Sequence, residues 1–279
     1  MIDLHTHTTA SDGTFSPAEL VDAAVAARLE AVAITDHDTF EGFDEAAPYA
    51  REKGLRLVCG IELSTKLLTP VRRTVLLLGY FLNSGPRPEL LSWILNLQAA
   101  RRDRNQRLAL KLQSMGIDVR LEEVEALGRR MAGRPHFARL LVAKGYCSTT
   151  TEAFDRYLDE SAPGYVDREE PGIGEAIARI REGGGISSLA HPIRLGKRDA
   201  AEEEHVISAM RDLGLQAIEV FHSDHMQTDM ARYLAIARKF GLKVTGGSDF
   251  HGENKPSIEI GRGAGNLAIP VSLLDELAQ

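Results

Sequence analysis

The sequence predicts an α/β domain that is built on a parallel β-sheet and carries one helical insertion. Short apolar runs alternate with helical patterns along most of the chain, which is typical of βαβ units. The length of 279 residues suits one large domain with a modest insertion. The composition, 43% hydrophobic and 26% charged, is that of a globular protein and indicates neither disorder nor a repeat array.

Seven apolar runs are the expected strands. In chain order they are Ile2–Leu4, Ala31–Thr35, Arg56–Cys59, Thr74–Tyr80, Gly185–Ala190, Ala217–Phe221 and Lys243–Thr245. The first helix has a clear start, because Ser16 is a typical N-cap, Pro17 suits the first helical position and Glu19 can complete a capping box. This helix is expected to end at about Ala27. Further helices are expected at about 41–53, 173–183, 202–213 and 228–240.

The stretch from Pro86 to Ala162 differs from the rest, because strand signals disappear and helical patterns take over. Helices are expected there at Leu90–Met115, Ala138–Lys144 and Thr151–Leu158. We therefore expect residues 86–162 to form a helical insertion that contributes to substrate binding. Residues 1–85 and 163–279 are expected to form the main domain.

Charge, cysteine content and hydropathy exclude several classes of protein. The net charge of −7 argues against binding to long duplex nucleic acid, although a small cationic pocket for a phosphate remains compatible with it. Cys59 and Cys147 are expected to be free and buried, because two distant cysteines do not make a disulfide framework. No apolar run approaches the roughly 20 residues of a membrane helix, and His5 leaves no room for a signal peptide, so we expect a cytoplasmic protein.

Histidines and carboxylates gather just after the carboxyl ends of the expected strands. They are His5, His7, Asp12, Asp36, His37, Asp38, Glu62, His191, His222, His225, Asp249 and His251. In α/β sheets and barrels the active site is assembled at this edge, so residues far apart in the sequence are expected to converge there. Residues two apart in an extended segment face the same side, so His5 can bind an ion together with His7, and Asp249 together with His251.

These side-chain types match the ligands of divalent metal ions. Imidazole combined with carboxylate favours Mn, Fe or Zn over Ca or Mg. Glu62 has two oxygens and could bridge two ions, as in enzymes of phosphoryl transfer. Each residue alone has a simpler explanation: His37 could be hydrogen-bonded within its turn, and Asp12 precedes Gly13 as in many turns. Their joint placement at several strand ends favours the metal site.

Six motifs mark these positions: His5-Thr6-His7, Ser11-Asp12-Gly13, Thr35-Asp36-His37, Glu62, Ala190-His191-Pro192 and Gly247-Ser248-Asp249-Phe250-His251. The set resembles the polymerase and histidinol phosphatase (PHP) family along nearly the whole chain. The resemblance implies a distorted (β/α)7 barrel with two or three divalent ions at its carboxyl-terminal rim, Mn2+ first and Fe2+ or Zn2+ as alternatives. It implies three ligand sets: His5, His7, Glu62 and Asp249; Asp12, His37 and His251; and Glu62 with His191.

One position departs from the family pattern. Members often carry a histidine in the fourth strand, near Leu76, where this chain is apolar. The third ion is therefore expected to be weak or absent, unless His222 from the sixth strand replaces the ligand.

The inserted segment narrows the resemblance to one branch of the family. The run from Gly133 to Arg139, with Phe154 and Pro163–Val166, resembles members with a helical insert. Those members remove the 3′-phosphate from 3′,5′-nucleoside bisphosphates, such as adenosine 3′,5′-bisphosphate, or degrade short RNA from its 5′ end. The resemblance implies the first activity. A 5′-3′ exoribonuclease is the main alternative, followed by a histidinol-phosphate phosphatase, a catalytically silent PHP module and an amide hydrolase.

The implied mechanism is in-line attack on phosphorus by a hydroxide that bridges two metal ions, with Asp249 as a catalytic ligand. His191 or His222 could protonate the leaving ribose oxygen.

Four residues are expected to contact a nucleotide or a short oligonucleotide: Arg134, His136, Arg194 and Arg104. Guanidinium groups suit phosphate because they donate paired hydrogen bonds. The arginines from Arg101 to Arg107 are expected to lie mostly on a solvated helix face, and His205 on the surface.

Overall fold

The computed structural model describes residues 1–67, 73–83, 85–128, 131–167, 170–196 and 199–279. Its seven strands form one sheet in which neighbours in the chain are neighbours in space. The strands are β1 (Ile2–Asp3), β2 (Ala31–Ile34), β3 (Arg56–Leu67), β4 (Arg73–Phe81), β5 (Ile186–Leu189), β6 (Ala217–His222) and β7 (Lys243–Gly247). This architecture confirms the predicted α/β class.

The prediction of an entirely parallel sheet is wrong at β4, which runs antiparallel to both β3 and β5. The reason is that β3 continues to Leu67 instead of ending near Cys59, so that residues 68–72 alone separate it from β4. Parallel neighbours need a crossover of a dozen or more residues, whereas antiparallel neighbours do not. The remaining neighbouring pairs are parallel, as predicted.

The two outer strands approach each other, so the sheet is a nearly closed barrel. Leu4 N donates to Gly246 O at 3.1 Å, and His7 N donates to Phe250 O at 2.9 Å. Asp249 N donates to His5 O at 2.8 Å. These bonds bring the segments that follow β1 and β7 side by side at one rim.

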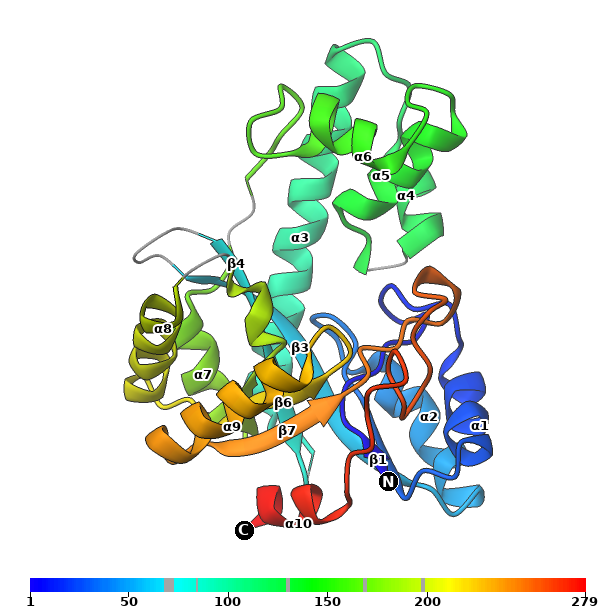
Figure 1. Cartoon of the computed structure of the whole chain (residues 1–279). Coiled ribbons are helices and arrows are strands. Elements are labelled where there is room, and N and C mark those ends of the chain that lie inside the picture. The colour runs from blue at the N-terminus through cyan, green and yellow to red at the C-terminus, as the bar shows by residue number, and fades with distance from the viewer. Residues whose placement is uncertain (68–72, 84, 129–130, 168–169, 197–198) are drawn as a thin grey trace.

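Helices surround the barrel (Figure 1). They are α1 (Pro17–Ala26), α2 (Glu41–Glu52), α7 (Ile173–Glu182), α8 (Ala200–Asp212), α9 (Gln227–Phe240) and α10 (Ser272–Ala278), with short 3-10 turns η3 (Pro192–Leu195) and η4 (Gly252–Asn254). Helix α1 starts as predicted, because Ser16 N donates to Glu19 Oε2 at 2.8 Å and Glu19 N donates back to Ser16 Oγ at 3.3 Å. Cys59 and Cys147 are free and buried, and His205 is exposed, as expected.

A helical lobe stands above one rim of the barrel (Figure 1). It comprises the upper part of α3 (Pro88–Ser114), then α4 (Leu121–Gly128), α5 (Arg134–Ala143), α6 (Thr150–Ala153) and the π-helical turn η2 (Phe154–Leu158). Its own hydrophobic core includes Leu108, Leu112, Phe137 and Leu141. Among the described helices, including the long α3, none combines the length and the apolar character of a membrane span.

The solvated face predicted for α3 is partly wrong. Arg101 and Arg104 are only 8% and 5% exposed. They lie on the part of α3 that passes from the barrel to the lobe, and neighbouring parts of the structure cover their side chains.

Candidate metal centre and cavity

The histidines and carboxylates predicted from the strand ends meet at the barrel rim below the lobe. Three groups of side chains each offer ligand atoms within 4.8 Å of one another: His7, Asp12, His37 and His251; His5, His222 and Asp249; and His5, His7 and Glu62. The predicted pairing of His5 with His7 is present, because their ring centroids are 5.2 Å apart. Thr6, between them, turns the other way and donates to Ala33 O.

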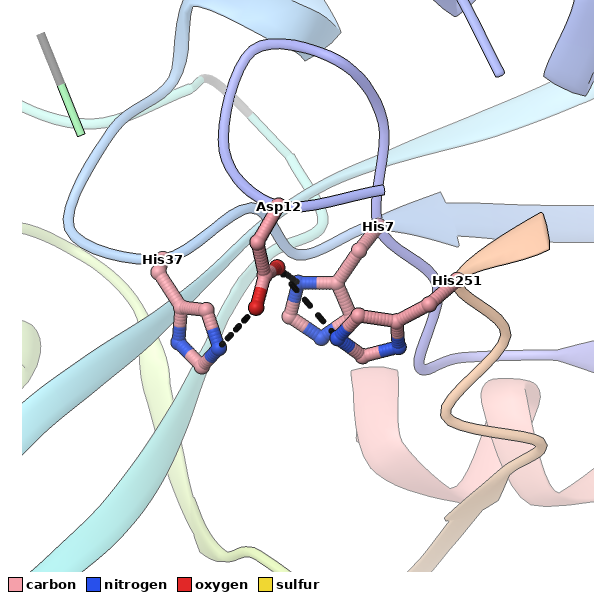
Figure 2. A group of neighbouring side chains, drawn as sticks. All are labelled: His7, Asp12, His37 and His251. Carbon is pink, nitrogen blue, oxygen red and sulfur yellow. Dashed lines mark ion pairs between the residues drawn. The ribbon is translucent and has the colours of Figure 1, made fainter. Parts of the chain in front are cut away.

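Figure 2 shows the first group converging around the carboxylate of Asp12. Asp12 Oδ1 lies 3.3 Å from His251 Nε2 and 3.7 Å from His7 Nδ1, and Asp12 Oδ2 lies 3.6 Å from His37 Nε2. These residues come from the loops after β1, β2 and β7. Sequence-distant loops therefore supply one compact set of ligand atoms.

Glu62 lies between two sets of histidines. Its Oε1 is 3.1 Å from His191 Nε2 and 3.4 Å from His5 Nε2. Its Oε2 is 3.1 Å from His37 Nδ1 and 3.4 Å from His7 Nε2. Glu62 was predicted to follow its strand, but it lies inside β3, which is longer than predicted. Two oxygens that face different histidines are the arrangement that a bridging carboxylate needs.

Several ring nitrogens in this cluster are buried and lack a hydrogen-bond partner among the residues that the structure describes. They are His5 Nε2, His7 Nδ1 and Nε2, His37 Nδ1 and His222 Nε2. Buried polar atoms are normally paired, so each of these needs a ligand of another kind. Imidazole nitrogens beside carboxylates are typical ligands of divalent cations. The residues present therefore fit divalent metal ions.

The carboxyl groups of the centre are held ionised. Burial alone would raise the pKa of Glu62, but the charges of His5 and His37 outweigh it, and the pKa lies well below its usual value. Burial opposes ionisation of Asp249 too, and His5, with a hydrogen bond from His222, lowers its pKa well below the usual range. Anionic oxygens are thus available at neutral pH for cation binding.

Three further buried carboxylates hold the ligand loops in place. Asp3 accepts from Ser248 N at 2.8 Å and from Ser248 Oγ at 2.6 Å, beside Asp249. Asp36 accepts from Thr8 N at 2.8 Å and from Ser11 Oγ at 2.5 Å, beside Asp12. Glu219 contacts His5 Nδ1 at 2.9 Å and accepts from His191 N at 2.7 Å.

The sequence analysis missed these roles for Asp3 and Glu219. The available signal was a lone carboxylate inside an otherwise apolar strand, since such residues are almost never fully buried unless they are paired.

Backbone geometry is strained where these side chains are presented. Asp38, His191 and Asp249 have positive φ values of 49°, 24° and 58°. Non-glycine residues rarely adopt this region, and those that do cluster at functional sites.

A cavity of about 440 Å³ opens above the metal ligands. Its lining comes from both the barrel rim and the lobe: Asp12, His37, Glu62, Leu76, Pro135, His136, Arg139, Thr150, Phe154, His191, Arg194, Asp249, His251, Asn254 and Lys255. One wall thus carries ligand-type groups, and the facing lobe wall carries a cation and an aromatic ring. Leu76 lines the cavity where the family pattern often has histidine.

Two of the four predicted substrate contacts, His136 and Arg194, line the cavity. Arg194 pairs with Asp224 Oδ2 at 2.6 Å and with Asp249 Oδ2 at 3.1 Å. Lys255, which the sequence analysis missed, lies 2.5 Å from the same Asp249 oxygen. Arg139, also missed, is exposed at the lobe wall.

The predictions for Arg134 and Arg104 are not supported by their positions. Arg134 donates to Leu158 O at 3.3 Å and stacks over Tyr165, so its guanidinium is engaged within the lobe. Arg104 is buried in α3. Neither is part of the cavity lining in the described ranges.

His222 lies in one of the candidate ligand groups, with His5 and Asp249, but outside the lining of the cavity in the described ranges. Its Nδ1 accepts from Asp224 N at 3.0 Å, and its Nε2 lies 3.4 Å from Asp249 Oδ2. The Nε2 atom is buried without a hydrogen-bond partner among the described residues, as expected of an atom that could face a metal ion. His222 is fully buried and is not among the described residues that line the cavity, so it reaches no leaving group there.

Comparison with known proteins agrees with this geometry. The PHP domain model matches residues 3–124. A 5′-3′ exoribonuclease of Haemophilus influenzae is 33% identical over 89% of this chain and 89% of its own length. A 3′,5′-nucleoside bisphosphate phosphatase of Chromobacterium violaceum is 31% identical over 93% of this chain and 90% of its own.

A solved structure from Bifidobacterium adolescentis, described as a metal-dependent phosphoesterase, superposes with a TM-score of 0.81. It is 34% identical in sequence, and the alignment covers 99% of this chain and 94% of that chain. Matches over nearly the full length of both partners include the lobe as well as the barrel. The chain therefore belongs to the PHP family and is a hydrolase that acts on phosphate esters.

Proposed function

We propose that this enzyme removes the 3′-phosphate of 3′,5′-nucleoside bisphosphates and leaves a 5′-nucleotide. The observation that carries the proposal is the two-walled cavity, in which metal ligands face a lobe wall with Arg139 and Phe154. The substrate has a matching polarity: a scissile phosphate at one end, and a base and a second phosphate further away. The similar bisphosphate phosphatase of Chromobacterium violaceum supports this choice.

The ligand-type side chains would hold the scissile phosphate end. Divalent ions, Mn2+ by the chemistry of the donors with Fe2+ or Zn2+ as alternatives, would supply an activated water and positive charge when bound by these side chains. His5, His7, Glu62 and Asp249 would hold one ion. Asp12, His37 and His251 would hold a second. Leu76 offers no donor, so a third ion would depend on His222, which lies with His5 and Asp249. Two or three ions are therefore expected.

The cations of the cavity would stabilise the transferring phosphoryl group. Arg194 and Lys255 both contact Asp249 and both line the cavity, so they lie beside the position of the reacting phosphate. Fixed positive charge at that point stabilises the charge on the phosphate oxygens in the transition state. We assign proton transfer to the leaving ribose oxygen to His191, which lines the cavity next to Glu62.

The lobe wall would recognise the rest of the nucleotide. Arg139 presents an exposed guanidinium for the 5′-phosphate, and Phe154 presents an aromatic ring for the base. His136 is neutral at pH 7, because burial and the charges of Arg139 and Arg101 lower its pKa to about 4. A neutral imidazole adds a hydrogen-bonding group to this wall without adding charge.

Phosphate release from adenosine 3′,5′-bisphosphate, measured beside nucleotide release from a 5′-phosphorylated oligonucleotide and phosphate release from histidinol phosphate, tests the proposal. We expect the highest kcat/KM with the bisphosphate. Arg139→Gln should raise the KM for the bisphosphate but not for adenosine 3′-monophosphate. Arg102→Gln is the matched control, because Arg102 pairs with Glu125 on the lobe surface. Turnover of the oligonucleotide without release from the bisphosphate would refute the proposal in favour of an exoribonuclease.

A further inference from the structure

Helix α3 crosses from one hydrophobic core to another through a polar belt. Leu90 and Ile94 belong to the barrel core, and Leu108 and Leu112 belong to the lobe core. Between these stretches α3 buries three polar side chains, Arg101, Arg104 and Asn105. A buried arginine is costly unless its charge is compensated, so the partners of this belt indicate what it does.

The belt contacts the turn that presents a metal ligand. Arg101 forms an ion pair with the carboxylate of Asp38, and its NH2 also lies 3.4 Å from Ser64 Oγ. One helical turn earlier, Gln98 Nε2 donates to Asp38 O at 2.9 Å. Two side chains of α3 thus hold both the backbone and the carboxylate of Asp38.

Asp38 connects the loop that carries His37 to the strand β3, which carries Glu62. It follows His37 directly and has a left-handed φ of 49°. Its N donates to Glu62 O at 2.9 Å, and its Oδ1 accepts from Ser64 N at 2.8 Å. The contact between His37 Nδ1 and Glu62 Oε2, at 3.1 Å, lies immediately beside these bonds.

The same belt contacts the lobe wall of the cavity. Asn105 Nδ2 donates to Ala132 O at 2.7 Å. A Cβ atom placed on Gly133 would lie 3.4 Å from Arg101 NH1, so the guanidinium packs against the start of α5. Helix α5 supplies His136 and Arg139 to the cavity.

From these contacts we infer that Arg101 is a positioning residue that couples the docking of the lobe to the geometry of the metal centre. Its guanidinium fixes Asp38, and through it the spacing of His37 and Glu62, while it also fixes the lobe wall above them. Buried ion pairs add little net stability, and in some proteins they select one geometry among several, which is the role that we assign to this pair. The inference rests on the proposed metal centre, because it concerns the ligands of that centre.

Manganese affinity, measured by titration of the metal-free protein with metal analysis of the bound fraction, tests the inference. Arg101→Met keeps the length of the side chain and removes its charge. We expect a 10- to 100-fold weaker Mn2+ affinity, the range typical of residues that orient metal ligands. Gln98→Ala, which leaves the ion pair intact, should weaken affinity in the same direction by about threefold. Arg102→Met is the control, because Arg102 is on the same helix, 63% exposed, and should change nothing.

Each result has a defined meaning. If Arg101→Met folds and binds Mn2+ with the wild-type affinity, the inference is overturned, even if the melting temperature falls. A merely structural role would lower stability and leave metal affinity unchanged. If Arg101→Met does not fold, Gln98→Ala decides, and unchanged affinity in that variant overturns the inference. Absence of Mn2+, Fe2+ and Zn2+ binding by the wild-type protein would instead refute the metal centre itself, so the two failures are distinguishable.

Discussion

Glu219 offers the sharpest test of how the barrel interior supports the metal centre. The substitution Glu219→Gln keeps the shape of the side chain and removes its charge. Glu219 faces His5 Nδ1 at 2.9 Å and accepts from His191 N at 2.7 Å. When His5 Nε2 faces a cation, its Nδ1 must carry a proton, and that proton needs an acceptor. A glutamine offers one acceptor oxygen and one NH2 group, so one of the two donors loses its partner.

The expected loss follows from these two contacts. A hydrogen bond to a charged group contributes about 1.5–3 kcal/mol, and about 1.4 kcal/mol corresponds to a factor of ten. The loss of one such bond, with the other weakened to a neutral one, predicts a divalent-ion affinity that is about 10- to 100-fold lower. The low pKa of Glu219, about 2 although burial alone would raise it, shows that the carboxylate is charged beside His5.

The assay is titration of metal-free protein with Mn2+, with kcat measured at saturating metal. Glu203→Gln is the matched control, because Glu203 is also buried and bonded, to Tyr233 OH at 2.9 Å, but it lies on α8 outside the barrel. We expect Glu203→Gln to lower stability without changing metal affinity. Equal metal affinity in Glu219→Gln and the wild type would refute the reasoning that this carboxylate orients His5.

Three further predictions follow from the site. Asp249→Ala, or His7→Ala, should abolish turnover while the circular dichroism spectrum stays native; activity near the wild-type rate with metal present would remove that residue from the centre. Chelation should lower the melting temperature, since ions at 100 times their Kd add about 2.7 kcal/mol to stability; an unchanged melting temperature would contradict metal binding by the folded state. His136 binds fewer protons folded than unfolded, because its pKa is lowered to about 4 by burial and then by Arg139. The contribution of His136 to stability should therefore fall as pH drops below about 6.5 and level off near 4, by at most about 3 kcal/mol, and urea midpoints should show a weaker pH dependence in His136→Asn.

The rim of the barrel could be predicted from the sequence because it depends on local patterns. Apolar runs mark strands, and the residue after each run lies at an edge that parallel strands share. Alternation within the segment that follows β1 placed His5 and His7 on one side without any knowledge of their neighbours. The seven strands and the α/β class followed from the same patterns.

Features that depend on pairing between distant segments could not be predicted in this way. The direction of β4 depends on the length of β3, and the apolar run at Cys59 gives no sign that pairing continues to Leu67. The sheet register shifts between Glu219 and Phe221, so simple alternation along β6 does not give the orientation of Glu219 or His222. The partner of His222 Nδ1, Asp224 N, is a backbone donor in a turn.

The arginines of the lobe show which signal would have been decisive. Helix α3 places Arg101 and Arg102 next to each other, yet one is 8% exposed and pairs with Asp38, while the side chain of the other is 63% exposed and pairs with Glu125. Spacing on the helix explains the difference, because Ile94, Arg101, Asn105 and Leu108 follow steps of seven, four and three residues and share one face. A charged residue on the buried face between two apolar stretches must meet an opposite charge where two cores join. At this junction the carboxylate of Asp38, on the rim of the barrel, supplies that charge to Arg101. An arginine outside the cavity can therefore act on the metal centre through the turn that carries His37, as we propose for Arg101.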